Sequence, residues 1–297
     1  MIIGAGYFCA CKGVVNTSAT DGMMSFAIKI AIPCLLFRAT SSIDLASAFQ
    51  WRLLSAYYLA ATSCFALSII LLRKFFQKRP GEAVAISFGA LFSNLVMLGL
   101  PISQRAWGSA GLETSFVLVA VNAPVCYLIG ISVMEISRAD GRGALATVKV
   151  VANEMFRNSL MIGIGLGLIV NLLEIELPGT MLSAIEMLAT AALPVALFGL
   201  GGILTRYSMR RSRNEATLIS LLSLLLQPLL TLLFCRLFEV DESTTRTAVL
   251  MSSVAPGLNA YLFACMYQRG EGAAASSVLM STIASVFSVS LWLLILR

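Results

Sequence analysis

The stretch AIPCLLF at residues 31–37 places a proline inside an apolar run that has no turn residues beside it. Pro33 has no backbone N–H, and its ring clashes with the preceding helical turn, so it disfavours a regular helix. The stretch nearly recurs as ALPVALF at residues 192–198, with Ala, Pro, Leu and Phe at the same positions. We therefore predict that Pro33 and Pro194 are corresponding helix breaks in a repeated architecture.

The composition indicates a membrane protein. Of the 297 residues 58% are hydrophobic and 12% are charged, which is half of the roughly 25% charged residues of a soluble domain. So much apolar surface cannot be hidden in a water-facing globule, and the lipid bilayer is the expected solvent. The net charge of +6 is then attributed to membrane orientation rather than to nucleic acid binding.

The missing residue types argue against catalysis, cofactors and metals. The chain has no histidine, which removes Ser-His and Cys-His nucleophile pairs and His-ligated zinc. Its seven cysteines form no C-x-x-C pair, so a metal or redox motif is not expected. We predict no enzyme activity, no cofactor and no metal site.

A membrane-spanning helix needs about 20 mostly apolar residues. The sequence predicts an all-α membrane protein with about ten transmembrane helices, at residues 1–14, 22–38, 52–73, 83–104, 114–136, 158–174, 180–204, 216–238, 245–267 and 273–296. The first of these is interrupted at Lys12 and is too short to cross about 30 Å of hydrocarbon.

Basic residues predict the orientation. They cluster in the loops after the third, fifth and seventh helices, at residues 73–79, 138–157 and 206–213. Basic loops stay in the cytoplasm, so both termini are predicted to be extracytoplasmic, in a multi-pass protein of the cytoplasmic (inner) membrane.

Internal similarity predicts two repeats. IIGAG at residues 2–6 resembles MIGIG at 161–165, at nearly the offset of the two proline stretches. Each half, 1–158 and 159–297, then holds five helices, and the odd number inverts the second half in the membrane. Inverted repeats with broken helices mark secondary transporters, which bind substrate near the midplane at the breaks.

The fourth and ninth helices carry the polar residues and helix breakers expected of such a site. They read SFGALFSNLVMLGLPIS (87–103) and MSSVAPGLNAYLFA (251–264). Freed N–H groups at a half-helix start suit an anion, and asparagine can both donate and accept. Hydrogen bonding between neighbouring helices is the alternative role of the asparagines. The predicted binding and break residues are Ser93, Asn94, Pro101, Pro256, Gly257 and Asn259.

Two further predicted helices each contain a polar residue close to a proline. Asn122 and Pro124 predict another polar break, in the fifth helix, and Asn122 is a candidate substrate-binding residue. Gln227 and Pro228 are a looser echo in the eighth helix. Either pair alone is more often a packing kink.

Lys29 is the one lysine deep inside a predicted span. A central lysine costs about 2.5–3.5 kcal/mol on insertion scales, so it normally meets a partner or a cavity. It either attracts an anion or pairs with Glu186 on the sister helix, or it snorkels toward an interface. Lys29 and Glu186 are therefore a candidate charge site.

The segments SNLVMLGLPI, APGLNAYLFACMY and ALPVALFGLGG together resemble the auxin efflux carrier family, of the superfamily of bile, arsenite and riboflavin transporter-like proteins. The pattern Asn-x-x-x-x-Gly-x-Pro fits Asn94, Gly99 and Pro101, with one residue more between Asn and Gly than in plant members. The resemblance covers nearly the whole chain and implies a bacterial member.

The resemblance also implies an architecture and a function. Helices 1, 2, 6 and 7 would form a scaffold that dimerises through helices 2 and 7, and helices 3–5 and 8–10 would form a transport domain in which broken helices 4 and 9 cross. Its known members carry small carboxylates, including auxin. The sequence thus predicts a secondary transporter of a small organic anion, working by alternating access. An ion or solute channel is the alternative.

Overall fold

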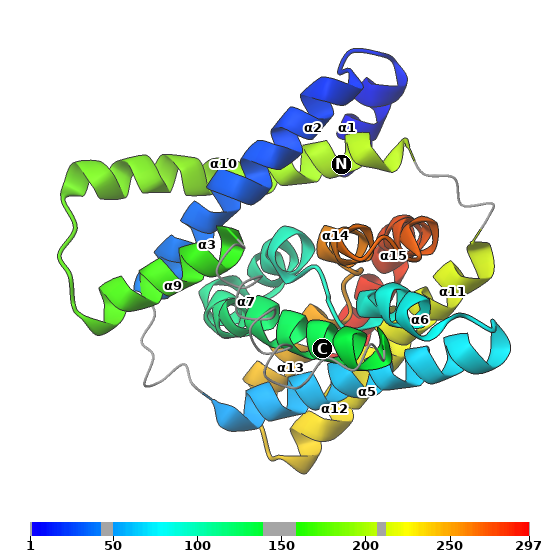
Figure 1. Cartoon of the computed structure of the whole chain (residues 1–297). Helices are drawn as coiled ribbons and strands as arrows, with labels where there is room; N and C mark the ends of the chain where they lie inside the picture. Colours follow the sequence, from blue (N-terminus) through cyan, green and yellow to red (C-terminus); the bar gives the residue numbers. More distant parts are fainter. Residues whose placement is uncertain (1, 43–49, 139–158, 207–211, 297) are drawn as a thin grey trace. The chain divides into compact units, whose positions relative to one another are not determined.

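The computed structural model describes residues 2–42, 50–138, 159–206 and 212–296. This part of the chain is helical, with connecting turns and one isolated β-bridge (Figure 1). The α-helices are α1 (Ile2–Cys11), α2 (Thr17–Phe26), α3 (Ile32–Ser41), α5 (Trp51–Phe75), α6 (Pro80–Ser87), α7 (Leu100–Arg138), α9 (Ser159–Leu172), α10 (Gly179–Leu204), α11 (Arg213–Leu221), α12 (Gln227–Leu237), α13 (Glu242–Ser252), α14 (Leu258–Met266) and α15 (Glu271–Ile295). The 3₁₀ helix η2 (Phe88–Ala90) and the π-helices η1 (Ala27–Ala31), η3 (Leu95–Gly99) and η4 (Leu222–Leu226) complete the set.

The helices form two compact units. Unit 1 lies within Met1–Ser47 and Val148–Tyr207, and unit 2 lies within Ala48–Thr147 and Ser208–Arg297. Unit 1 contains α1, α2, α3, α9 and α10, and the remaining helices belong to unit 2. Each unit thus joins helices from both halves of the sequence. The repeat boundaries and the scaffold and transport roles stay predictions.

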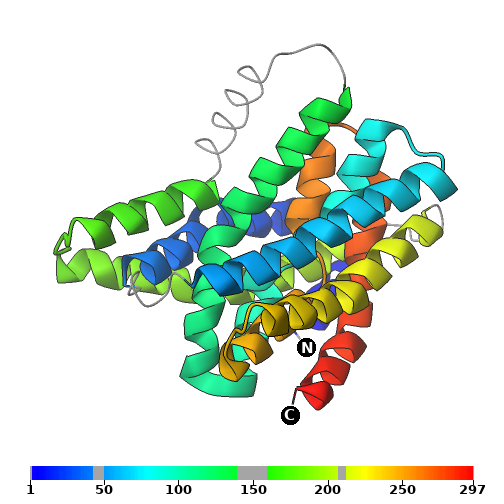
Figure 2. The same cartoon turned by 90° about the horizontal axis from the view of Figure 1, so that it is seen from below.

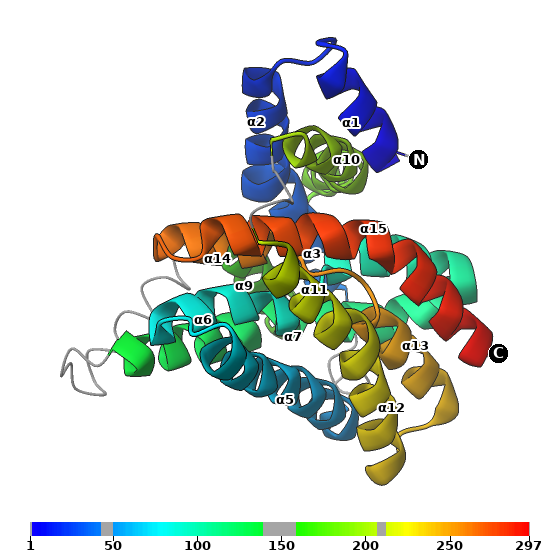
Figure 3. The ribbon, with the colours of Figure 1, turned by 90° about the vertical axis from the view of Figure 1, so that its right-hand side faces the viewer.

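In unit 1, α10 lies between α1 and α2 (Figure 3), and α3 packs against α9 (Figure 1). The close approach needs glycine, because a Cβ on Gly6 would lie 2.0 Å from the Phe198 carbonyl oxygen, and one on Gly167 would lie 2.5 Å from that of Phe37. The two glycines and the two phenylalanines are each separated by 161 positions. The contacts are therefore reciprocal, as two related halves would produce.

Three prolines follow a widened helical turn. Pro33, Pro101 and Pro228 each occupy the second residue of an α-helix, directly after the five-residue π-helices η1, η3 and η4. A proline ring clashes with the carbonyl four residues earlier, and the longer i→i+5 spacing of a π turn relieves that clash. The chain stays helical through Pro33, so the predicted break there is wrong: the proline produces a π turn. Pro101 lies in the first turn of α7, after the non-helical residues 91–94, so the break predicted at Pro101 lies earlier in the chain.

Pro194 differs from Pro33 although their sequence contexts match. Helix α10 runs from Gly179 to Leu204 with Pro194 inside it. The predicted break at Pro194 is therefore wrong. A membrane helix tolerates an internal proline when neighbouring helices satisfy the freed backbone groups, and α10 is packed against α1, α2 and α3.

Helix α7 is a hairpin of two helical arms. Its backbone leaves the helical region at Gly108, where φ is 63° and ψ is −140°. The hydroxyls of Ser103 and Ser115 are 2.9 Å apart, whereas twelve residues of straight helix span about 18 Å. The chain therefore reverses at Gly108, which separates the predicted fourth and fifth helices.

Six helices of the described part are long and apolar enough to cross a membrane: Thr17–Arg38, Trp51–Phe75, Leu95–Ser137, Gly179–Ile203, Arg213–Leu237 and Glu271–Ile295. The protein is thus an all-helical, multi-pass membrane protein. All ten predicted ranges overlap helix, but five of them do not stand as separate long spans. Helix α1 and α9 are short, α13 and α14 are separated by a break, and the fourth and fifth ranges share one run. Ten crossings stay a prediction.

In unit 2, α5 lies beside α12 (Figure 2) and α11 packs against α15. A small ion-pair network joins the turn after α5 to α11: the Lys78 ammonium lies 2.9 Å from Glu82 and 3.1 Å from Glu215. Burial opposes the charge of Lys78, but the two carboxylates outweigh it and raise the lysine's pKa.

Candidate functional site

The two broken helices of unit 2 meet at their breaks. The first break, residues 91–94, separates η2 from η3, and the second, residues 253–257, separates α13 from α14. The Asn94 N–H donates to the Ala255 carbonyl at 2.9 Å, and the Gly257 N–H donates to the Phe92 carbonyl at 3.0 Å. Hydrocarbon cannot satisfy such freed backbone groups, so each break supplies partners for the other.

Polar groups of the first break also form hydrogen bonds with the residues that follow it in the chain. Asn94 caps η3, because its side-chain Oδ1 accepts from the Met97 N–H at 3.2 Å. Its carbonyl oxygen accepts from both Leu98 and Gly99, each at 3.1 Å. Of the Asn94 amide, the Nδ2 donor is the group left to offer a ligand. Ser93 and Asn94 are both buried.

Fewer of the polar groups at the second break are hydrogen-bonded. Pro256 has no N–H, and it lies in the non-helical segment as predicted. The N–H groups of a helix's first turn have no intrahelical acceptors; in α14 that turn begins at Leu258 and carries Asn259. The Asn259 side chain is half-buried, and it makes no hydrogen bond to any described residue. The Ala260 N–H of this turn donates to the Gly257 carbonyl at 3.0 Å, whereas the N–H groups of Leu258 and Asn259 make no hydrogen bond to a described residue.

Asn122 approaches the first break through a cysteine. It lies within the continuous second arm of α7, so the predicted break at Asn122 and Pro124 is wrong. Its buried Oδ1 lies 3.4 Å from the Cys126 thiol, which is also 3.6 Å from the Leu91 carbonyl oxygen. Asn122 is thus close to the break, but its oxygen is partly engaged.

An aromatic cluster that sequence analysis missed holds the two breaks together. Phe88, just before the first break, stacks on Phe263, just after the second, with ring centroids 4.0 Å apart and an interplanar angle of 9°. The Tyr127 ring is tilted to both of these rings, the Phe92 ring is tilted to Phe88, and Tyr127 and Phe92 meet edge-on. Gly130 makes room, because a Cβ there would lie 2.4 Å from the Phe88 ring.

The buried polar groups of the described part carry no formal charge. They are serine, threonine, asparagine and glutamine side chains. No group of three or more cysteine, aspartate or glutamate residues among those described is arranged to hold a metal ion. The meeting point of the breaks therefore offers amide and backbone dipoles to a ligand.

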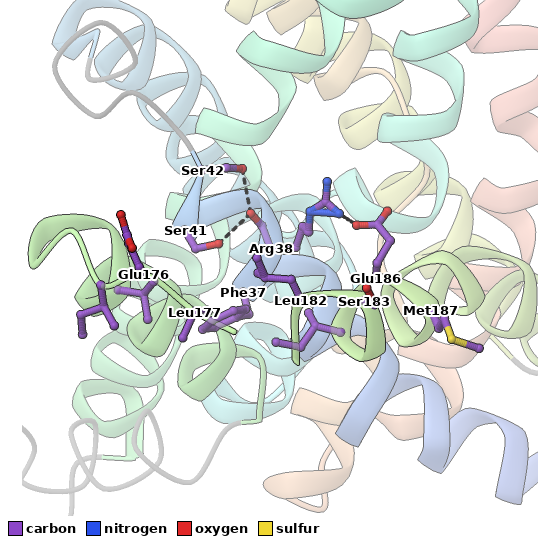
Figure 4. Close-up of a pocket in the computed structure, with 13 residues that line it drawn as sticks. Phe37, Arg38, Ser41, Ser42, Glu176, Leu177, Leu182, Ser183, Glu186 and Met187 are labelled. Atoms are coloured by element: carbon purple, nitrogen blue, oxygen red, sulfur yellow. Dashed lines mark hydrogen bonds and ion pairs between the residues drawn. The ribbon is translucent and has the colours of Figure 1, made fainter. Parts of the chain in front are cut away.

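The predicted pairing of Lys29 with Glu186 is not formed, and a role of Lys29 in attracting an anion stays a prediction. Glu186 pairs with Arg38, not with Lys29, in unit 1 (Figure 4). This pair lines an open hollow of about 960 Å³ between α3, α9 and α10, and both side chains are about half exposed. Lys29 is exposed on η1 and has no ion pair with any described residue. The pairing prediction was wrong because the guanidinium of Arg38, nine residues after Lys29, pairs with the Glu186 carboxylate instead.

Comparison with known proteins identifies the class. The family model described as membrane transport protein, which is the auxin efflux carrier family, matches residues 1–293. The chain belongs to this family. An uncharacterized transporter of Methanothermobacter thermautotrophicus is 25% identical over 232 residues, which cover 77% of this chain and 74% of that protein. The family consists of membrane transport proteins, so the protein belongs to the class of transporters.

Proposed function

We propose that the protein is a secondary transporter that moves a small organic anion, a carboxylate, across the cytoplasmic membrane by alternating access. The observation that carries the proposal is the hydrogen-bonded pair of breaks in unit 2, with Asn94 and Asn259 beside it. Broken helices at the centre of a transporter are where substrates bind.

The chemistry of the breaks favours an anion. The N-terminal end of a helix carries partial positive charge and free N–H donors, and α14 begins directly at the second break. The Asn259 amide and the Asn94 Nδ2 add donors. A cation would meet no buried carboxylate in the described part, whereas a carboxylate would receive hydrogen bonds that replace its water.

The proposed architecture follows from the family resemblance. Unit 2 would carry the substrate and unit 1 would form the scaffold, with a second copy of the chain bound through the helices at residues 22–38 and 180–204. Both termini would be extracytoplasmic. The orientation is tested separately, by labelling Ser243→Cys and Ser212→Cys in a background without the native cysteines, from outside intact cells: only Ser243→Cys, at an exposed position, should react.

Transport by purified protein in liposomes tests the function. We expect uptake of at least one labelled mono- or dicarboxylate, and faster uptake when the liposomes contain the same unlabelled anion. Such trans-stimulation distinguishes a carrier from the channel alternative, because a channel has no site that must return. Sodium and pH gradients, applied one at a time, would identify the coupling ion. No uptake across the panel, with uptake of amines or neutral solutes instead, would contradict the proposal.

A further inference from the structure

Two buried polar groups in unit 2 have no partner in the described part of the chain. They are the Tyr57 hydroxyl on α5 and the Gln227 Nε2 at the start of α12. Both residues are 0% exposed. An unsatisfied buried donor is costly and rare in native proteins, so two of them close to one side chain need an explanation.

Both groups surround Ser93 of the first break. The Ser93 hydroxyl lies 3.4 Å from Gln227 Oε1, which is long for a bond between oxygens. The same side chain is near enough to the Tyr57 hydroxyl to interact with it as a loose hydrogen-bond partner, but the geometry falls short of a well-formed bond. Three side chains from three elements therefore converge, and none of their contacts with one another is well made.

The cluster is distinct from the proposed anion site. Ser93 and Asn94 are consecutive in a non-helical stretch in which Ser93 forms the β-bridge to Pro256. The two side chains have different partners: the Asn94 side chain caps η3, whereas the Ser93 side chain meets Gln227 at the start of α12. The unpartnered groups therefore cluster around Ser93 and not around the Asn94 amide that the proposed anion site uses.

We propose that one ordered water molecule occupies this cluster and bridges Tyr57, Ser93 and Gln227. A buried water typically makes about three hydrogen bonds to otherwise unsatisfied groups, and it bridges polar atoms that do not reach each other directly. It accepts from the tyrosine hydroxyl and the glutamine amide and donates to Ser93. If the amide nitrogen and oxygen were exchanged, the water would donate instead, so either orientation is satisfied.

A cation fits the cluster less well than water. Ca²⁺ takes about six or more oxygen ligands, and the cluster offers at most three side-chain oxygens even when the amide is exchanged. The described part has no buried carboxylate to balance its charge. The water instead ties α5 and α12 to the first break, which makes Tyr57 and Gln227 positioning residues for Ser93.

A double-mutant cycle on melting temperature tests this, with protein in lipid nanodiscs. Tyr57→Phe and Gln227→Met should each lower the melting temperature by about 2–4 °C, because each removes a bond to the water. The two side chains make no hydrogen bond to each other, but both approach Ser93, so the cycle is repeated in a Ser93→Ala background. A shared water still couples them there, and the double variant should fall no further than the worse single variant. Additive losses would overturn the proposal.

The direction in which Tyr57→Phe changes the melting temperature distinguishes a cluster that holds a water from one that does not. In an empty cluster, Tyr57→Phe removes a costly unsatisfied donor and raises the melting temperature, which would also overturn the proposal. Tyr58→Phe is the matched control, because its hydroxyl donates to the Leu118 carbonyl at 3.1 Å, and its loss sets the scale of one buried bond.

A salt comparison addresses the cation. Any difference in melting temperature between sodium chloride and choline chloride of equal concentration should be the same for wild-type and Tyr57→Phe protein. A rise in sodium that Tyr57→Phe abolishes would assign the cluster to a cation and refute the water. None of these measurements depends on knowing the transported substrate, so failure of the proposed function would leave them unaffected.

Discussion

The two breaks of unit 2 are made by different means. In the first, no proline interrupts the backbone, and the Asn94 side chain and carbonyl use up most of the donors that begin η3. In the second, Pro256 interrupts the backbone, and the start of α14 has the unpaired Asn259 beside it. A self-capped break is rigid and closed to ligands, whereas an uncapped one keeps its donors available. The second break should therefore do most of the binding, and the first should hold the geometry.

The largest expected effect disturbs both breaks together. Gly130→Ala places a Cβ against the Phe88 ring, so the stack on Phe263 must shift. Overpacking of this kind costs about 1–3 kcal/mol, and melting should fall by several degrees with poorer transport. Gly165→Ala on α9 is the control, because nothing lies within 4 Å of its Cβ position. Equal melting temperatures of the two variants would show that the aromatic cluster does not hold the two breaks together.

The cap of the first break predicts a separation of stability from binding. Asn94→Ala removes an N-cap worth about 1 kcal/mol and also the Nδ2 donor. Asn94→Ser retains a capping oxygen but no amide, so its melting temperature should return toward the wild-type value while substrate affinity stays low. If serine restores neither property, the asparagine does not act as a cap.

Pro256→Ala probes the second break. Alanine restores an N–H and the freedom of the unfolded chain, which should cost about 0.4–1 kcal/mol of stability. It also allows residues 253–257 to close helical hydrogen bonds and remove the free donors, so substrate affinity should fall a fewfold. The same variant with unchanged affinity would show that the break persists without proline.

The smallest effect is expected at Lys78, outside the breaks. Lys78→Met should lower stability by no more than about 1 kcal/mol, because the pair is partly exposed. Its raised pKa means that the contribution is complete below about pH 10.4, the unperturbed value, and is lost as the pH rises through the folded pKa. From neutral pH upward, wild-type and variant melting temperatures should therefore converge only in strong alkali, and a difference that vanishes near pH 7 would contradict the assignment.

The sequence located both breaks because their causes are local. Asn94 and the Pro256–Gly257 pair are strong signals in helices that otherwise read as apolar spans. It misjudged Pro33 and Pro194, since a π turn in one case and continuous packed helix in the other replaced the expected break. The pairing of Glu186 with Arg38, and the convergence of Tyr57 and Gln227 on Ser93, join residues far apart in the chain, which one sequence does not reveal.

The most direct test of the account is the affinity of purified Asn259→Leu protein for the best-transported carboxylate, measured beside wild type and Asn94→Ser. Hydrogen bonds to a charged group are worth about 1.5–3 kcal/mol, so Asn259→Leu should bind roughly ten- to a hundredfold more weakly with little change in melting temperature. Asn94→Ser should lose less. Wild-type affinity in both variants would move the substrate away from the breaks and contradict the central claim.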